Sequence, residues 1–317
     1  MLTLRHLPAR GAVPVALTVG NFDGVHLGHR AMLATLCSEA QARGLRSCVM
    51  TFEPHPREFF SPDQAPTRLT SLREKLELLA GLGVEQVHVR RFDYDFARVT
   101  AEDFVDRVLV QQLGTRWILV GDDFRYGARR QGDFDQLRTA GLRHGFEVVR
   151  MESVCVQGVR VSSTAVRERL AGGELVAAAR LLGRPYSISG RVVVGARLGS
   201  QLGFPTANVQ MKHNRPPLAG IFVAQVLGID EQPREAVASL GLRPTVVAGG
   251  APVLEVYLLD FAGDLYGRHL QVRFLHKLRD EEKYANLDLL KAQIARDAAA
   301  ARAYFRAATA ARILNAR

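Results

Sequence analysis

The spacing of apolar residues changes once along this chain of 317 residues, near residue 185. Before that point, short apolar runs alternate with segments in which apolar residues recur every three or four positions. After it, apolar and polar residues alternate one by one. The first pattern is typical of parallel strands joined by helices, and the second of antiparallel strands. Since the length also exceeds that of one usual core, the sequence predicts two domains, 1–185 and 186–317.

The first domain is predicted to be an α/β unit. Strands are expected at 13–19, 47–52, 85–92, 116–121 and 146–151. Helices are expected at 27–43, 71–83, 101–113 and 133–144, the second and third of which follow the capping residues Ser71 and Thr100. This alternation predicts a mostly parallel sheet with helices on both faces, which binds its ligand at the carboxyl ends of the strands.

The second domain is predicted to be a small antiparallel barrel followed by one helix. Apolar side chains alternate at Val192 and Val194, and in the runs 222–226, 254–258 and 270–274, which glycine, proline, asparagine and aspartate separate. A long stretch rich in Ala and Arg, 287–314, predicts the helix.

The composition limits which ligands, partners and cellular compartments are expected for this chain. The net charge is +10, but the arginines are scattered among acidic residues, so small phosphorylated ligands fit as well as nucleic acid. No apolar stretch near the start is long enough to span a bilayer. The three cysteines are far apart and suggest neither a disulfide framework nor a thiolate zinc site. We expect a cytoplasmic protein with no nucleic-acid or membrane partner and leave its oligomeric state open.

Two histidines occur where the first strand should lead into the first helix. In the stretch VGNFDGVHLGHR, His26 and His29 fall on one face of the first helical turn. Together with the helix N-terminus they offer donors to the oxygens of a polyphosphate, and Gly24 and Gly28 leave room for a close approach. Two isolated histidines at this spacing are more often surface residues or incidental packing, and such a pair can also bind metal. Their place at the expected ligand-binding edge favours the phosphate interpretation.

A second candidate phosphate site lies at residues 195–209, GARLGSQLGFPTANV. No lysine follows a glycine anywhere in the chain, so the P-loop motif is absent and phosphoryl transfer would need another scaffold. Gly195, Gly199 and Gly203 permit a loop whose amides face phosphate. The Thr206 hydroxyl and the Asn208 amide oxygen, which follow Pro205, are hard ligands suited to Mg²⁺. A hairpin turn in which Thr and Asn bond their own backbone is the alternative.

Several motifs of this chain occur in the same order as in a known protein family. GNFDGVHLGH, TFEPHP (51–56), GDDFRYG (121–127) and SSTAVRERL (162–170) resemble the nucleotidyltransferase part of the bacterial bifunctional riboflavin kinase/FAD synthetase family. GFPTAN, LRPTV (242–246), LEVYLLDFAGDLYG (254–267) and FLHKLRDEEKY (274–284) resemble its riboflavin kinase part. The resemblance implies a Rossmann-like FMN adenylyltransferase domain followed by a six-stranded antiparallel kinase barrel with a C-terminal helix. It also implies that riboflavin is phosphorylated to FMN, that FMN is adenylylated to FAD with release of pyrophosphate, and that both steps use ATP and Mg²⁺.

The resemblance also assigns residues. In the adenylyltransferase site, the histidines stabilise charge on the phosphates. The ATP-binding residues would be Gly20, Asn21, Phe22, Gly24, His26, His29, Ser163, Thr164 and Arg167. The flavin-binding residues would be Phe52, His55, Asp123, Phe124 and Tyr126, the last standing where the family often has Phe.

In the kinase domain, the resemblance assigns ATP binding to the glycine-rich segment and Mg²⁺ binding to its threonine and asparagine. The residues would be Gly195, Gly199, Gly203, Pro205, Thr206 and Asn208. Glu255 is expected to be the general base, since it faces away from Leu254 and Val256 on an alternating strand. Ser200 stands where family members commonly carry Arg, which predicts weaker ATP binding.

Three alternatives remain at this stage. A single-activity adenylyltransferase with an inactive barrel has no reason to keep the P-T-A-N segment and Glu255. A class I aminoacyl-tRNA synthetase needs a lysine-bearing loop in its second half, where this chain has SSTAVR. A flavin-responsive binding module would tolerate other residues at His26, His29 and Glu255. The sequence therefore favours the bifunctional enzyme.

Overall fold

The computed structural model describes residues 1–4, 13–195, 198–213, 215–242 and 252–315. The chain divides into two compact units. The first consists of Met1–Pro66 and Leu72–Ser163, and the second of Thr67–Ser71 and Thr164–Arg317.

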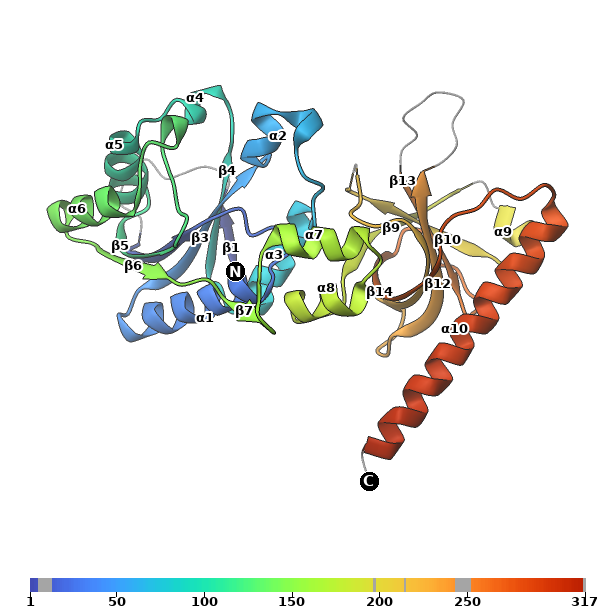
Figure 1. Cartoon of the computed structure of the whole chain (residues 1–317). Coiled ribbons are helices and arrows are strands. Elements are labelled where there is room, and N and C mark those ends of the chain that lie inside the picture. Colours follow the sequence, from blue (N-terminus) through green and yellow to red (C-terminus); the bar gives the residue numbers. More distant parts are fainter. Residues whose placement is uncertain (5–12, 196–197, 214, 243–251, 316–317) are drawn as a thin grey trace. The chain divides into compact units, whose positions relative to one another are not determined.

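Six parallel strands form the sheet of the first unit, in the order β1-β4-β3-β2-β5-β6 (Figure 1). These strands are β1 (Leu2–Leu4), β2 (Val15–Val19), β3 (Arg46–Glu53), β4 (Gln86–Arg91), β5 (Thr115–Gly121) and β6 (Glu147–Met151). The five predicted strands are confirmed. The short edge strand β1 was not predicted, because three residues are too few to show an alternation.

Helices connect these strands. They are α1 (Leu27–Ala42), α2 (Pro56–Phe60), α3 (Leu72–Gly81), α4 (Tyr94–Ala97), α5 (Ala101–Asp103), the π-helix η2 (Phe104–Gln112) and α6 (Phe134–His144). Two 3₁₀ turns, η1 (Pro62–Gln64) and η3 (Ala128–Arg130), and a hairpin of β7 (Cys155–Val156) and β8 (Val159–Arg160) complete the unit. The predicted helix at 101–113 is thus mostly π-helical. Apolar spacing did not reveal this, since both helix types can bury the same stripe.

The core of this unit lies on both faces of the sheet. Leu17 packs with η2 and α6 on one face, and its neighbour Ala16 packs with α1 and α3 on the other. Alternate strand residues thus serve two apolar layers, as expected for a parallel sheet covered by helices. The α1 residues Leu33 and Leu36 are fully buried, which confirms the predicted apolar face of this helix.

The second unit contains a closed six-stranded antiparallel barrel, in the order β10-β13-β12-β11-β14-β9. Its strands are β9 (Ser187–Val193), β10 (Thr206–Met211), β11 (Gly220–Leu227), β12 (Arg234–Leu242), β13 (Pro252–Leu258) and β14 (His269–Arg279). Its helices are α7 (Ser163–Ala171), which begins at the last residue of the first unit, α8 (Leu175–Leu182), α9 (Leu198–Gln201) and α10 (Leu287–Asn315). The barrel and the C-terminal helix confirm the predicted fold. The alternation expected through Val194 is wrong, because β9 ends at Val193 and Val194 is exposed.

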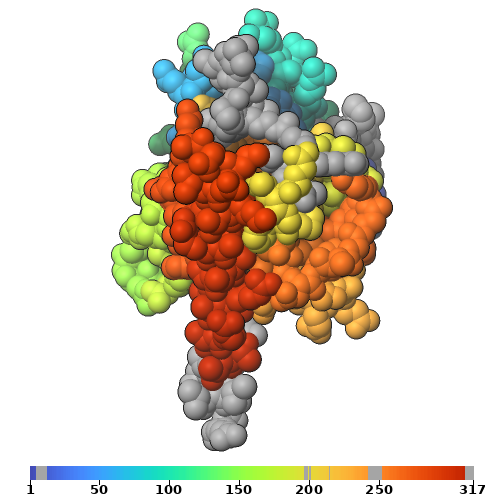
Figure 2. Space-filling view, turned by 90° about the vertical axis from the view of Figure 1, so that its right-hand side faces the viewer, coloured from blue at the N-terminus to red at the C-terminus, as the bar shows by residue number. Residues whose placement is uncertain are grey.

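The wall of the barrel has an inner and an outer apolar layer. The β13 residues Leu254 and Val256 are buried on its inner side. On the outer side, Val237 of β12 packs against Ala301 and Phe305 of α10. Figure 2 shows α10 running down this face, with its last turns extending past the strands. The helix therefore covers part of the outer wall.

Candidate active sites

The first candidate site lies at the carboxyl ends of β2, β3 and β5. From β2 the chain passes through α1 to β3 on one side, whereas β5 lies on the other side of β2. The strand order therefore reverses at β2, and open parallel sheets bind ligands beside such a reversal. The glycine-rich segment from Gly20 follows β2, and the segment containing Phe124 follows β5.

The two histidines form a stacked pair at the start of α1. His26 is the N-cap residue, and its Nδ1 accepts a hydrogen bond of 3.3 Å from the His29 backbone N–H. Their ring centroids are 3.6 Å apart with an angle of 13° between the planes. Because Nδ1 of His26 is an acceptor, its proton belongs on Nε2, which makes Nε2 a donor for a ligand.

His29 is held neutral by its surroundings. Burial lowers its pKa well below the usual value, and the nearby His26 and Lys75 lower it further. Its Nδ1 is buried and has no hydrogen-bond partner among the described residues. A buried polar atom without a partner is uncommon and fits a position that a ligand completes.

Asn21, in the loop between β2 and α1, provides a second buried polar atom. Its Oδ1 has no partner in the described part of the chain, while its backbone oxygen accepts a 3.2 Å hydrogen bond from Thr51 Oγ1. Lys75 Nζ in turn donates to Thr51 Oγ1 at 3.4 Å. Sequence reasoning missed Lys75, although it shares the apolar stripe of α3 with Leu72 and Leu79, where a lysine is unusual.

The backbone of this loop is also unusual. Phe22 and Val25 have φ angles of 49° and 41°, and both are buried. Residues with side chains rarely adopt such angles, and each costs on the order of 1–3 kcal/mol. Gly24, at φ 81°, takes the same region without that cost. The Phe22 ring lies 5.0 Å from the His29 ring, so the strained loop helps to position the pair.

The residues expected to contact phosphate at 163–167 are divided between the two units. Ser163 Oγ donates to the Asp23 backbone oxygen at 2.9 Å and so lies beside the loop. Thr164 is exposed. Arg167 belongs to the second unit, where its Nε donates to the Thr67 backbone oxygen at 2.5 Å.

The expected flavin contacts fall into two kinds. Phe52 and Phe124 are partly buried at the margin of an apolar cluster and can offer ring faces. Tyr126 stacks on Phe124 with centroids 5.7 Å apart, but it is buried over Gly132. Burial and the Asp133 charge raise the pKa of Tyr126 to about 12. Its ring therefore packs against Phe124 in the interior.

Two polar residues and several aromatic ones complete this region. Asp123 is exposed. His55 is the N-cap of α2, because its Nδ1 accepts from Arg57 N–H at 3.0 Å. Beyond the predicted set, Phe59 contacts Phe92 and Tyr94, with centroids 5.4 and 4.8 Å apart. No sequence spacing signalled this cluster, because its members come from different segments.

The second candidate site is a row of polar side chains on the outer wall of the barrel. Glu255 on β13 is paired in register with Asn208 on β10 and with Ser239 on β12. Paired residues share a face of the sheet, so all three side chains lie on one side. That side is opposite to Leu254 and Val256, as predicted for Glu255. Ser239 was not predicted, since no local motif marks it.

Asn208 supplies an orphaned acceptor in this row. The residue is 8% exposed, and its Oδ1 is buried without a partner among the described residues. Its amide group lies directly over Gly195, where any side chain would collide with it. Thr206, two residues earlier on the same face of β10, has its hydroxyl near Gly199. Both oxygens thus face the glycine-rich segment, a donor set suited to Mg²⁺.

The glycine-rich segment at 195–209 is not the loop that was expected. Gly199 lies within the short helix α9, Gly203 follows this helix at φ 86°, and Pro205 directly precedes β10. The LRPTV motif lies mostly at 243–246, outside the described residues, as does the side chain of Ser200.

Two further findings concern the parts of the chain that the structure describes. There, no group of three or more His, Cys, Asp or Glu side chains is placed to hold a metal ion. No helix in those ranges is long and apolar enough to cross a membrane.

In a comparison with known protein families, two family models match this chain. A FAD synthetase family model matches residues 10–165, and a riboflavin kinase family model matches residues 182–305. The chain belongs to the bifunctional riboflavin kinase/FMN adenylyltransferase family. It is 52% identical over 302 residues to the member from Escherichia coli (strain K12), covering 95% of both chains. It is 51% identical to the member from Pseudomonas fluorescens, covering 90% of this chain and 91% of that one.

The fold also has a solved counterpart. A crystal structure from Streptococcus pneumoniae, titled a macrolide-efflux protein, superposes with a TM-score of 0.80 and 28% identity. The match covers 95% of this chain and 99% of that one. The two proteins thus share one fold over nearly the whole chain.

Proposed function

We propose that this enzyme of flavin cofactor biosynthesis carries out its two ATP-dependent reactions at the two sites described above. In the second unit, riboflavin is phosphorylated to FMN. In the first unit, FMN is adenylylated to FAD. The proposed domain limits are 1–185 for the adenylyltransferase and 186–317 for the kinase, and the proposed partners are the small molecules riboflavin, FMN and ATP.

In adenylyl transfer, an FMN phosphate oxygen forms a bond to the α-phosphorus of ATP while the bond to pyrophosphate breaks. No enzyme nucleophile is needed, so the protein contributes positioning and charge stabilisation. We assign that task to His26 Nε2, to His29 and to the amides at the start of α1. The assignment is supported by the buried, partnerless Nδ1 of His29. Ser163, Thr164 and Arg167 remain the proposed ligands of the departing phosphates.

In phosphoryl transfer, the 5′-oxygen of riboflavin forms a bond to the γ-phosphorus of ATP, ADP leaves, and the hydroxyl proton passes to Glu255. The observation that carries this assignment is the register of Glu255 beside Asn208. It places a base next to an oxygen ligand without a protein partner. When bound, Mg²⁺ neutralises charge on the transferring phosphates. Thr206 and Asn208 would hold it.

A cytoplasmic location is also proposed. Cys37, Cys48 and Cys155 are all free thiols, and Cys155 is exposed. Free exposed thiols are in keeping with a reducing compartment.

Replacement of Glu255 with Ala tests the kinase site. We expect FMN formation from riboflavin to fall by roughly 10²–10⁴-fold, the usual contribution of a general base. Supplied FMN should still be converted to FAD, because Glu255 is not among the residues proposed for the adenylyltransferase site. Both products are measured by chromatography. Full kinase activity in the variant would contradict the assignment of the base.

A further inference from the structure

A second carboxylate lies beside the proposed kinase base. Glu281, in the segment between β14 and α10, reaches β12, where its carboxylate occupies the place that a side chain at Gly241 would take. The Ser239 hydroxyl, two residues before Gly241 and on the same face of β12, donates a hydrogen bond to it. Burial raises the pKa of Glu281, the Glu255 charge raises it further, and Ser239 and Arg279 oppose that change. Glu281 and Glu255 therefore lie near each other.

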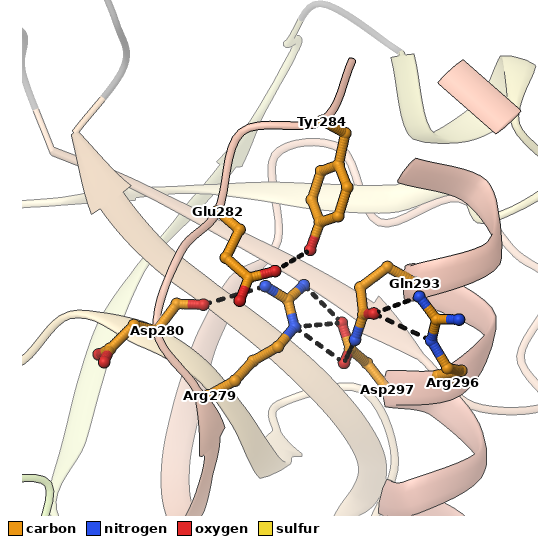
Figure 3. A network of polar contacts seen from close by, with 7 residues as sticks. All are labelled: Arg279, Asp280, Glu282, Tyr284, Gln293, Arg296 and Asp297. Carbon is orange, nitrogen blue, oxygen red and sulfur yellow. Dashed lines mark hydrogen bonds and ion pairs between the residues drawn. The ribbon is translucent and has the colours of Figure 1, made fainter. Parts of the chain in front are cut away.

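The segment that carries Glu281 is held on both sides. Figure 3 shows Arg279 bound to Asp297 of α10, with Nη2 2.7 Å from Oδ2 and Nε 3.0 Å from Oδ1. Arg279 Nη1 also donates to the Asp280 backbone oxygen at 3.0 Å, and Tyr284 Oη donates to Glu282 at 3.0 Å. These contacts involve residues on both sides of Glu281 in the sequence. The reach of its side chain toward β12 is therefore built into the segment.

The strand order shows on which side of the base Glu281 lies. Asn208, Glu255 and Ser239 occupy the consecutive strands β10, β13 and β12. Neighbouring strands are about 4.8 Å apart, so Asn208 and Ser239 are separated by roughly 10 Å. A magnesium ion with ligands at about 2.1 Å held at Asn208 therefore cannot also bind Glu281. The phosphates belong on the Asn208 side of Glu255.

The attacking hydroxyl must lie on the other side. In an in-line transfer, the attacking and leaving oxygens are on opposite sides of the phosphorus. With the terminal hydroxyl at Glu255 and the phosphates toward β10, the rest of the polyol chain leads over β12. There it meets the carboxylate of Glu281, and an ionised carboxylate only accepts hydrogen bonds while hydroxyl groups donate them.

We propose that Glu281, oriented by Ser239, accepts hydrogen bonds from the secondary hydroxyl groups of the ribityl chain and so determines specificity for a polyol-bearing flavin. The inference rests on the kinase roles proposed above for Glu255 and Asn208. A site built to bind substrate hydroxyls rejects analogues that lack them, because its polar groups are then left unpaired.

The test compares two substrates of the kinase reaction. One is riboflavin, and the other is the 7,8-dimethyl isoalloxazine with a 5-hydroxypentyl chain at N10, which keeps the reacting hydroxyl and lacks the secondary ones. Glu281→Ala should lower kcat/KM for riboflavin about tenfold or more, mainly through KM, and leave the analogue within about twofold, since only riboflavin has secondary hydroxyl groups whose hydrogen bonds to the carboxylate are lost. Gly241→Ala, which displaces the carboxylate without removing it, should act in the same direction.

The controls separate a direct contact from a structural effect. Asp280→Ala removes the adjacent carboxylate, which is 83% exposed, and should leave the ratio of the two kcat/KM values unchanged. Far-UV circular dichroism, which reports on both units, shows whether each variant is folded.

Equal losses with both substrates, an unchanged ratio in Glu281→Ala, or a wild-type enzyme that does not distinguish them would each overturn the proposal. If instead the assignment of Glu255 as the base is wrong, kinase activity will survive the Glu255→Ala substitution. That result is distinct from the outcomes for Glu281.

Discussion

The contact between Arg279 and Asp297 allows a quantitative test of how α10 is held to the barrel. Asp297→Ala removes three charge-assisted hydrogen bonds from Arg279, at 3.0, 3.2 and 2.7 Å, and also the 2.9 Å bond from Gln293. Hydrogen bonds to charged groups contribute roughly 1.5–3 kcal/mol each, and removing one partner of a buried pair costs about 3–5 kcal/mol. Arg279 is 18% exposed, so water can partly replace its partner. We therefore expect the second unit to lose about 3 kcal/mol of its free energy of unfolding.

Two probes of urea unfolding separate the units. The single tryptophan, Trp117, is buried in β5 and reports on the first unit by fluorescence, whereas far-UV circular dichroism reports on both. Asp297→Ala should shift the circular dichroism transition of the second unit and leave the Trp117 transition in place. The control is Asp230→Ala, whose pair with Arg234 is 44% and 45% exposed and should contribute less than about 1 kcal/mol. A loss in Asp297→Ala no larger than in this control would refute the reasoning.

Three further predictions concern activity, pH and packing. His29→Ala should reduce FAD formation roughly 10²–10³-fold and spare riboflavin phosphorylation, as seen by product chromatography; unchanged FAD synthesis would remove the role of the histidine pair. Burial lowers the pKa of His88 to about 4, so its contribution to stability should be complete above pH 6.5 and decline by up to about 3 kcal/mol as the pH falls to 4. Trp117 fluorescence should show this decline, and an identical decline in His88→Gln would contradict it. Gly190→Ala would drive a methyl group into the Gln210 backbone oxygen on β10 and should cost the second unit about 1–3 kcal/mol in urea unfolding; a wild-type midpoint would show that the strands move apart freely.

Much of the fold could be predicted, because its signals are local. The five longer parallel strands and α1 follow from apolar spacing and from end signals such as Gly44, which has φ 63° just after the helix. β12 was missed because its sequence, REAVASLGL, is dominated by small residues that give a weak alternation. Its burial results from pairing with β11 and β13, which no local pattern records.

The candidate sites were predictable to the extent that single segments carry them. His26 and His29 lie on one helical turn, and the outward direction of Glu255 follows from strand alternation. The register that sets Glu255 beside Ser239, and the return of Glu281 to β12, depend on contacts between distant segments. Lys75 gave a usable signal, since a lysine in an apolar stripe demands a polar neighbour in the interior.

The inner face of the barrel wall carries residues that stabilise the fold, and the outer face carries the residue proposed for catalysis. Leu254 and Val256 are buried inside the barrel, while Glu255, between them on the same strand, faces outward, where we propose that it acts as the base. Alternate positions of one strand thus serve the stability of the barrel and its proposed chemistry separately. A substitution at the outward position Glu255 should therefore leave the buried interior of the barrel unchanged.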